Sequence, residues 1–481
     1  MKMRAPNILF ITCDQLRRDA LGCYGGRPDV SPHIDALAKR SARFEQAYVA
    51  SPVCSPNRAS WVTGCYPTAH GLTVNGVRLR HDSTTLMECL RQAGYQTAAA
   101  GKLHFEPQWA QHYGQPNFNE EVARGIGAVD PQPRELPYFG LERCAIAEDH
   151  HAGPYEAFVR SHGLDPWVDP HSAMYPQHMV CRSALPASLS KTTWIAERSM
   201  EFMRMRDRDK PLFLWCSFVH PHHPFVVPKP FDRRFDPAEM ESPVWEEAMI
   251  ERWPERLKRK YFAEAGSHEA VGMHKLTDAD FRRIRAAYLG MVAHVDEQVG
   301  RVLRALEADG MVDDTIIVFS SDHGELLGDY HLLFKAAHYR CVTRVPLLVA
   351  HPRCAAGVSE ACTSAVDLMP TLLEMAGCSV PAGVQGRSFA ACVKDVALPL
   401  RDEVYIEDPG PVRTLMTPRQ RITWHGCGER GEFYELDRDP GELVNRWDDV
   451  AVAGEKYRAL DRLIGALALE APKPVKREYF F

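Results

Sequence analysis

The chain has 481 residues, of which 45% are hydrophobic and 25% are charged, and its formal net charge at pH 7 is -6. This composition is typical of a globular protein with a sizeable core and excludes extensive disorder. The 57 Lys and Arg residues are scattered along the chain, which argues against a nucleic-acid-binding protein, because such proteins usually carry a basic stripe.

The first strongly apolar run, NILFITCD at residues 7–14, is too short to cross a membrane, and no small-residue cleavage site follows it. We therefore expect a cytoplasmic protein with neither a membrane segment nor a secretory signal. The 14 cysteines include no C-x-x-C pair. We expect most of them to be buried reduced thiols, and a zinc-ribbon interpretation has little support.

Five short, continuous apolar runs are typical of strands buried on both faces of a parallel sheet. These runs are residues 7–14, 96–102, 211–220, 315–324 and 345–352. Helical patterns lie between them, and the clearest one begins at a capping pair, Thr277 and Asp280, and stops at Gly310. Strands that alternate with helices predict an α/β layered fold, in which ligands bind beyond the carboxyl ends of the strands.

Two segments depart from this alternation. Residues 105–185 are rich in Pro, Gly, His and aromatic residues with weak periodicity, so we expect a long irregular excursion near the site. From Pro399 the chain has short strand-like pieces (EVYIED, RQRITWHG and EFYELD) and a final helix near residues 452–470. We therefore predict a main domain over residues 1–398 and a small C-terminal subdomain over residues 399–481.

Carboxylates and a histidine follow two of the predicted strands. Asp14 ends the first strand, and Asp322 and His323 end a later one in the sequence SSDHGE. An Asp after a strand is usually a turn or capping residue. Two strand-end carboxylates with a histidine, however, suit a hard divalent cation, and the oxygen ligands favour Ca²⁺ or Mg²⁺ over Zn²⁺.

Basic side chains stand at other strand ends: Lys102 and His104 in AGKLHF, His222 in VHPHHPF and Lys335 in LLFKAAH. For any one histidine among the 21 in the chain, a structural role is the better interpretation. Together with a cation, these residues are what a multiply charged oxyanion substrate requires. The cation and the lysines would neutralise oxygens, and the histidines would transfer protons.

The stretch CSPNRASWVTG resembles the C-x-P-x-R signature of the type I sulfatases, a family within the alkaline phosphatase superfamily. The similarity spans nearly the whole chain and leaves only residues 105–185 and 230–275 uncovered. It implies a large mixed, mostly parallel sheet sandwiched by helices, as in alkaline phosphatase, and a small C-terminal α+β subdomain with an antiparallel sheet. The segments that follow the family's pattern in the family's order are NILFITCDQLRRDALGCYG, GYQTAAAGKLHF, SFVHPHHPF, TIIVFSSDHGELLGDYHLLFK, VDLMPTLLEMAG and FYELDRDPGE.

The resemblance also implies a chemistry for Cys54. In the family, a formylglycine-generating enzyme oxidises this cysteine to formylglycine, and one hydroxyl of the hydrated aldehyde attacks sulfur. The sulfated hemiacetal then expels sulfate by C–O cleavage once its other hydroxyl loses a proton. We therefore expect an arylsulfatase-like hydrolase that cleaves small-molecule sulfate esters and has no nucleic-acid or membrane partner.

The resemblance assigns one divalent cation to Asp14, Asp322, His323 and the modified Cys54, with Ca²⁺ expected and Mg²⁺ or Mn²⁺ as alternatives. The family often has a second Asp after the first, whereas this chain has Gln15. The carbonyl oxygen of a glutamine can still serve as a ligand, so we include Gln15 in the expected ligand set. The site is then one charge less negative.

The remaining roles also come from the resemblance. Arg58 would hold the formylglycine hydrate, Lys102 would contact sulfate oxygens, and His104 would take the hemiacetal proton. His222 and Lys335 would face the leaving-group oxygen and supply a proton or positive charge as the S–O bond breaks. We select His222 because the family pattern is His, any residue, Pro.

Three further features of the sequence lead to predictions about modification, substrate recognition and oligomeric state. Asn57 stands where the family commonly has a smaller or hydroxylated residue, but we still expect modification because the converting enzyme reads chiefly Cys, Pro and Arg. We expect leaving-group recognition at Asn75 and in residues 105–185. The KREYFF tail at residues 476–481 carries aromatic side chains that would dock on a partner subunit, so a homo-oligomer is considered.

The nearest alternative is a phosphonate monoester or phosphodiester hydrolase of the same superfamily. Gln15 and His323 lean towards these relatives, which generally lack the Lys-x-His pattern that Lys102 and His104 provide. A non-catalytic anion-binding member of the fold would have an unconverted Cys54 or broken ligands. A cysteine hydrolase would need a base to activate the thiolate. We prefer the sulfatase interpretation.

Overall fold

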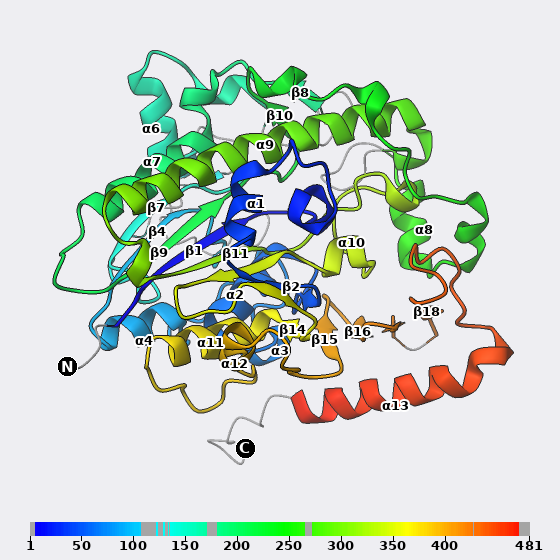
Figure 1. Ribbon diagram of the computed structural model, residues 1–481. Coiled ribbons are helices and arrows are strands. Elements are labelled where there is room, and N and C mark those ends of the chain that lie inside the picture. Colours follow the sequence, from blue (N-terminus) through cyan, green and yellow to red (C-terminus); the bar gives the residue numbers. More distant parts are fainter. Residues whose placement is uncertain are drawn as a thin grey trace, which may run out of the picture.

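The first apolar run forms strand β1 (Asn7–Cys13), which lies inside a sheet of eight strands in the order β13-β2-β12-β11-β1-β9-β4-β7 (Figure 1). The computed structural model describes residues 5–106, 122–123, 128–129, 133, 135–170, 180–264, 272–426 and 428–470. The other strands of this sheet are β2 (Ala42–Phe44), β4 (Gln96–Gly101), β7 (Arg143–Ile146), β9 (Leu212–Phe218), β11 (Thr315–Ser321), β12 (Leu347–Ala350) and β13 (Gly357–Ser359).

The sheet is mixed and mostly parallel, as the resemblance implied. The pairs β13–β2, β11–β1, β1–β9, β9–β4 and β4–β7 are parallel, whereas β12 runs antiparallel to both β11 and β2. The prediction of a parallel strand at residues 345–352 is therefore wrong in direction. A continuous apolar run indicates burial on both faces of a sheet and carries no information on strand direction.

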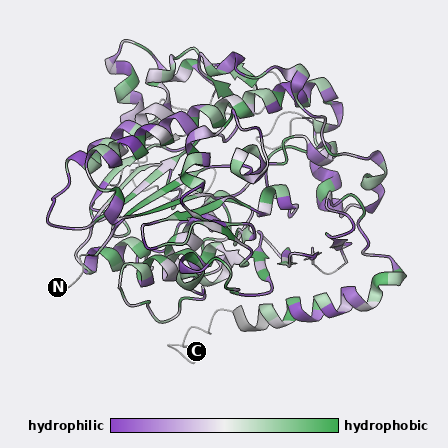
Figure 2. Ribbon diagram, in the orientation of Figure 1, coloured by the Kyte–Doolittle hydropathy of each residue, from purple (hydrophilic) through white to green (hydrophobic). Residues whose placement is uncertain are grey.

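Helices cover both faces of the sheet because its strands are apolar on both sides (Figure 2). Leu9 and Ile11 of β1 join the core cluster with the helices on one face, and Ile8 and Phe10 join the cluster on the other. One layer contains α1 (Pro32–Ala38), α7 (Lys191–Arg204) and α9 (Asp278–Ala308), and the other contains α2 (Cys54–Thr63), α4 (Leu86–Gln92), α11 (Leu368–Met375) and α12 (Ala390–Lys394).

The long helix α9 begins and ends where the sequence predicted. The side chain of Thr277 accepts a hydrogen bond from the backbone of Asp280, whose carboxylate accepts one from the backbone of Thr277, so the capping box is present. The helix ends before Gly310, which has a φ of 66°. This reciprocal pairing satisfies two backbone donors that the first helical turn leaves without partners.

The segment 105–185, which we expected to be irregular, contains regular structure among its described residues. Its strand β7 is the edge strand next to β4, and helix α6 (Pro154–Ser161) follows. Other short pairs are β3 (Ala47–Tyr48) with β14 (Thr363–Ser364), β5 (Val122–Ala123) with β6 (Ala128–Val129), and β8 (Val180–Arg182) with β10 (Phe225–Val227). The remaining α-helices before the second sheet are α3 (Pro67–His70), α8 (Glu255–Phe262) and α10 (Arg340–Thr343).

A second, four-stranded antiparallel sheet follows residue 398, as predicted. Its strands are β15 (Val404–Glu407), β16 (Arg413–Met416), β17 (Gln420–Trp424) and β18 (Glu432–Glu435). Helix α13 (Ala453–Glu470) packs on β16 and β17, which agrees with the final helix expected near 452–470. The KREYFF tail lies outside the described residues, and the domain boundary at residue 398 stays a prediction. No helix in the described ranges is long and apolar enough to cross a membrane.

Candidate active site

The carboxyl ends of β1, β4, β9 and β11 meet at one edge of the large sheet. Because Cys13 and Ser321 are partners in the parallel register, the next residues, Asp14 and Asp322, leave the sheet side by side. Lys102 directly follows β4, which pairs with β9. The topology thus explains why residues far apart in the sequence converge.

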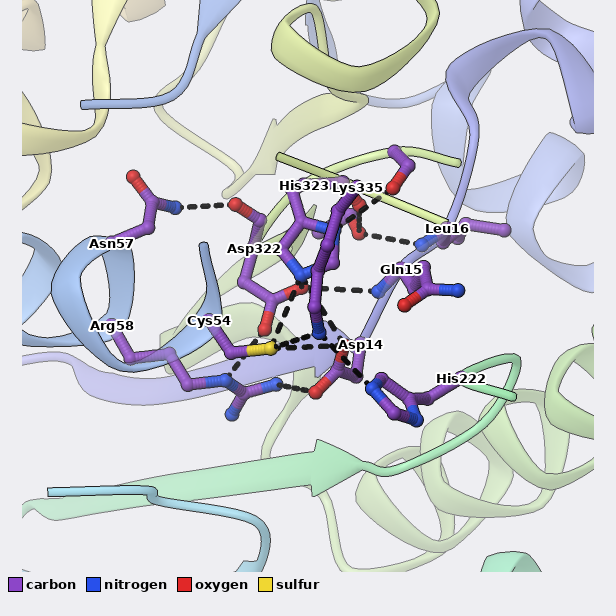
Figure 3. Close-up of polar contacts among 12 residues, drawn as sticks. Asp14, Gln15, Leu16, Cys54, Asn57, Arg58, His222, Asp322, His323 and Lys335 are labelled. Atoms are coloured by element: carbon purple, nitrogen blue, oxygen red, sulfur yellow. Dashed lines mark hydrogen bonds and ion pairs between the residues drawn. The ribbon is translucent and has the colours of Figure 1, made fainter. Parts of the chain in front are cut away.

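Cys54 lies at the start of α2 and is completely buried among these residues. Its Sγ atom is 3.2 Å from Nε2 of His323, 2.6 Å from Nζ of Lys335 and 3.8 Å from Oδ1 of Asp14 (Figure 3). One ligand atom from each of Asp14, Cys54, Asp322 and His323 lies within 4.8 Å of the others. The structure therefore brings together four of the predicted cation ligands.

The donor set fits a divalent cation. Nδ1 of His323 lies 2.8 Å from the carbonyl oxygen of Gly324, so this nitrogen is the donor and Nε2 is left with its lone pair towards the cluster. That Nε2 atom is 3.6 Å from Oδ1 of Asp14 and 3.7 Å from Oδ1 of Asp322. Burial lowers the pKa of His323, which favours the neutral imidazole that binds metals.

Burial and neighbouring charges shift the pKa values of Asp14 and Cys54. Burial raises the pKa of Asp14, but the ammonium of Lys102 and then His222 outweigh it and hold this pKa well below its usual range. Asp14 is therefore ionised. Burial, followed by the neighbouring Asp14, raises the pKa of the Cys54 thiol to about 12. An unmodified thiol here is a poor nucleophile, which weighs against the cysteine hydrolase.

Gln15 follows Asp14 but turns its side chain to other partners. Its backbone N–H donates to Oδ1 of Asp322 at 3.0 Å, while its amide nitrogen lies 3.0 Å from Nδ1 of His223 and contacts the carboxylate of Glu325. Its φ of 67° lies in the left-handed region. The amide oxygen is buried without a hydrogen-bond partner, and Gln15 as a cation ligand stays a prediction.

Arg58 is completely buried and holds the carboxylates in place. Its Nε donates to Oδ2 of Asp322 at 2.7 Å, and its Nη1 donates to the carbonyl of Lys102 at 2.7 Å and to Oγ of Ser217 at 2.9 Å. Nη2 lies 3.6 Å from Oδ2 of Asp14. A single guanidinium thus ties together the ends of β1, β4, β9 and β11.

Asn57, the departure from the family pattern, has partners for both ends of its amide. Its Nδ2 donates to the backbone carbonyl of Asp322 at 2.6 Å, and its Oδ1 accepts the backbone N–H of Ala50 at 2.8 Å. The larger residue is accommodated because it satisfies two buried backbone groups.

Lys102 lies between two carboxylates, one of which the sequence did not single out. Its Nζ is 2.6 Å from Oδ2 of Asp14 and 2.5 Å from Oδ1 of Asp149. Asp149 follows the edge strand β7 in the segment 105–185, which the family resemblance leaves uncovered. The only available signal was the acidic pair in AIAEDHH directly after a short apolar stretch.

His104 is placed beside Lys102 by a strained turn. It has a φ of 57°, and its backbone N–H donates to Oε1 of Glu148 at 2.9 Å. Its Nδ1 is buried without a hydrogen-bond partner. Burial, followed by Lys102, keeps its pKa well below the ordinary histidine value. The imidazole is therefore neutral, the form that can take a proton.

His222 and Lys335 meet beside Cys54, whose Sγ lies 2.6 Å from Nζ of Lys335. Nε2 of His222 lies 3.0 Å from Nζ of Lys335, and its Nδ1 lies 2.5 Å from the carbonyl of His223. Burial and the Lys335 ammonium hold the pKa of His222 well below its usual range. His223 instead contacts Gln15, so the structure brings His222 rather than His223 to Lys335.

A cavity of about 60 Å³ adjoins the site. Asp149 and His222 line it on the side of the site, together with His151, Tyr155 and Lys191. Asn75 lies elsewhere, at the start of α2, where its Oδ1 accepts the backbone N–H of Ser55 at 3.1 Å. Asn75 therefore lies next to position 54, and its contact with substrate stays a prediction.

These features define a class of protein. A cluster of possible cation ligands with two lysines and two histidines, at the carboxyl edge of a mostly parallel sheet, is the arrangement that an oxyanion-ester hydrolase of the alkaline phosphatase superfamily requires. Two family models place the chain more narrowly within this superfamily. The Sulfatase family model matches residues 6–378, and the model for the C-terminal part of N-sulphoglucosamine sulphohydrolase matches residues 328–464. The chain belongs to the sulfatase family, whose members are sulfuric ester hydrolases.

Similar proteins agree with this assignment. The chain is 30% identical to a choline-sulfatase of Rhizobium meliloti, over 92% of its length and 82% of the relative's. It is 28% identical to an arylsulfatase of Clostridium perfringens, over 92% of its length and 90% of the relative's. Among solved structures, a phosphonate monoester hydrolase of Agrobacterium radiobacter superposes with a TM-score of 0.81 at 25% identity, covering 97% of this chain and 96% of that one.

Proposed function

We propose that the chain hydrolyses small-molecule sulfate esters through a formylglycine made from Cys54, with one divalent cation. The observation that carries this proposal is the place of Sγ: the atom is fully buried at the start of α2, within reach of His323, Lys335 and Asp14. In the unmodified chain Sγ stands in for the oxygens of the formylglycine hydrate. The hydrate supplies an oxygen nucleophile, and the cation supplies positive charge beside it.

The chain's own residues would hold these groups in a fixed geometry. Asp14, Asp322 and His323 would bind the cation, with Gln15 as a further oxygen ligand. Arg58 would keep both carboxylates oriented, since it bonds Asp322 and lies beside Asp14. Ca²⁺ is the expected ion because oxygen ligands dominate the set, and Mg²⁺ or Mn²⁺ are the alternatives.

The basic residues would act at the two ends of the breaking S–O bond, some on the leaving-group oxygen and others on the sulfate group. Lys335 and His222 lie together, 3.0 Å apart, and would face the leaving-group oxygen, where the Lys335 ammonium would supply positive charge and a proton and the neutral His222 would hold that ammonium in place. Lys102 would contact the sulfate oxygens. The neutral His104, held beside Lys102, would accept the proton of the hydrate hydroxyl that does not attack.

The test combines modification and activity. We expect mass spectrometry to find formylglycine at position 54 when the chain is co-expressed with a formylglycine-generating enzyme. The apparent kcat measured with p-nitrophenyl sulfate should rise in proportion to the converted fraction. Cys54→Ala, which cannot be converted, is the matched control and should have no activity. Full activity of a preparation with an unmodified thiol would overturn the proposal.

A second candidate, hydrolysis of phosphonate monoesters or phosphodiesters, has specific support. Two phosphonate monoester hydrolases superpose with TM-scores of 0.81 and 0.79, each at 25% identity, and Gln15 stands where sulfatases often have Asp. Relative kcat/KM values for p-nitrophenyl sulfate, phenyl phosphonate esters and phosphodiesters separate the two candidates. We expect the sulfate ester to be preferred, and a large preference for phosphorus esters would select the second candidate.

A further inference from the structure

Asp149 is an acidic residue of the site to which neither the family resemblance nor the proposed function gives a role. Its Oδ1 lies 2.5 Å from Nζ of Lys102, which is also 2.6 Å from Oδ2 of Asp14, and one ligand atom from each of Asp14, Asp149 and His222 lies within 4.8 Å of the others. The side chain is 24% exposed and lines the cavity that His222 also lines. The carboxylate therefore faces the space open to a substrate, whereas Asp14 and Asp322 are completely buried.

The position of this carboxylate is fixed by the segment 148–150. The ammonium of Lys191 donates to the backbone carbonyls of all three residues, at 2.5, 3.1 and 2.7 Å. The carboxylate of Glu148 accepts the backbone N–H groups of Leu103 and His104, at 3.1 and 2.9 Å. The segment is thus tied to α7 on one side and to the turn after β4 on the other, so Asp149 and Lys102 are held together.

The Asp149 carboxylate is ionised in this setting. Burial raises its pKa, but Lys102 and then His222 outweigh that effect and hold the pKa well below the usual value for an aspartate. Around Cys54, three cationic side chains, Arg58, Lys102 and Lys335, are matched in number by three carboxylates, Asp14, Asp149 and Asp322. Without Asp149 this set would carry one more positive charge, in addition to the charge of the proposed cation.

We propose that Asp149 determines the charge of the ester that the site accepts. By offsetting Lys102 on the side open to substrate, its carboxylate favours esters that carry one negative charge, such as sulfate esters, over phosphate monoesters. A phosphate monoester carries nearly two negative charges above about pH 7 because its second pKa is about 6. A second charge that approached this fixed carboxylate to about 5 Å would be disfavoured by about 10- to 100-fold.

This inference rests on the proposed function for the identity of the favoured ester. Asp149 acts through Lys102 and through its own field, and it needs no contact with the reacting atoms. A purely structural role predicts that loss of the side chain lowers the turnover of every ester by the same factor. A charge-selecting role predicts that the ratio between doubly and singly charged esters changes. The two roles therefore differ in a measurable quantity.

The experiment compares Asp149→Asn, which removes the charge at nearly constant shape, with Asp149→Glu, which keeps the charge and shifts its position. Both variants and the wild type are produced with the converting enzyme, loaded with the cation, and matched for the converted fraction of Cys54. The kcat/KM values for p-nitrophenyl phosphate and p-nitrophenyl sulfate are measured at about pH 8. We expect Asp149→Asn to raise the phosphate-to-sulfate ratio by about 10-fold or more, and Asp149→Glu to leave it within about 2-fold.

An unchanged ratio in Asp149→Asn, or an equal rise in Asp149→Glu, would overturn the inference. If Asp149→Asn does not fold, the phosphate-to-sulfate ratio of kcat/KM is measured with Asp149→Ser instead, which removes the same charge. A wild type without activity on sulfate esters would refute the proposed function instead. The inference is then decided separately, with the singly charged phenyl phosphonate ester in place of the sulfate ester.

Discussion

Asn57 offers a quantitative test of how the site is supported. The side chain is fully buried, and its amide bonds the carbonyl of Asp322 at 2.6 Å and the N–H of Ala50 at 2.8 Å. Asn57→Ala removes both bonds and leaves two buried backbone groups without partners. Each such group costs about 1–3 kcal/mol. We expect a loss of about 2–4 kcal/mol in the free energy of unfolding, because water entering the vacated space recovers part of the sum.

The assay is urea unfolding followed by tryptophan fluorescence, which reports on this region because Trp61 of α2 lies 6.2 Å from Trp215, between ring centroids. Asn75→Ala is the matched control: Asn75 is half-buried in a loop beside the first turn of the same helix, and its Oδ1 accepts one bond, from the backbone N–H of Ser55. This control should cost about 1 kcal/mol or less. If Asn57→Ala costs no more than Asn75→Ala, the two buried bonds do not support the site as argued.

Three further outcomes are expected. Chelation of the cation should lower kcat by more than about 100-fold and lower the urea midpoint, because a cation that binds only the folded chain stabilises it and this contribution is then lost. Ca²⁺ should restore both, and activity that survives chelation contradicts the cation site. His222→Ala should lower kcat/KM by about 100- to 1,000-fold for phenyl sulfate and by less than about 10-fold for p-nitrophenyl sulfate, whose leaving group needs no proton; equal losses contradict a leaving-group role. Burial raises the pKa of Asp408, but the guanidinium of Arg256 outweighs it and lowers this pKa to about 2. The resulting stability, about 2 kcal/mol, is present above about pH 4 and lost as pH falls towards 2. The difference in unfolding free energy between wild type and Asp408→Asn should accordingly shrink from pH 6 to pH 3, and a constant difference contradicts the pairing.

The residues that could be predicted are those attached to strong local patterns. Asp14 and Asp322 each follow an apolar run, and the parallel register that makes them neighbours is a general property of such sheets. Cys54 and Arg58 were recognisable because the motif that contains them is contiguous. For these residues, a local signal in the sequence was sufficient to place them at one site.

The features that could not be predicted depend on contacts between distant segments. The antiparallel direction of β12 is set by its neighbours β11 and β2, whereas the sequence indicated only burial. The sequence pattern did not distinguish β16 from a loop, although β15 and β18 have the same length and were predicted. Asp149 gained its place from β7, an edge strand inside a segment with weak periodicity. The left-handed backbone at Gln15, which turns its amide to Glu325 and His223, leaves no mark in the pattern of polar residues.

The inner position of β1 has a consequence for when the chain can fold during its synthesis. On one side β1 pairs with β11, and the partner residues Cys13 and Ser321 are 308 positions apart. At a synthesis rate of about 5–20 residues per second, the first strand waits about 15–60 s for this partner to be made. In the finished protein the Cys54 side chain is 0% exposed. An enzyme that converts Cys54 would therefore have to act before the folded chain closes over it, and the proposed function predicts that a chain that folds unmodified is inactive.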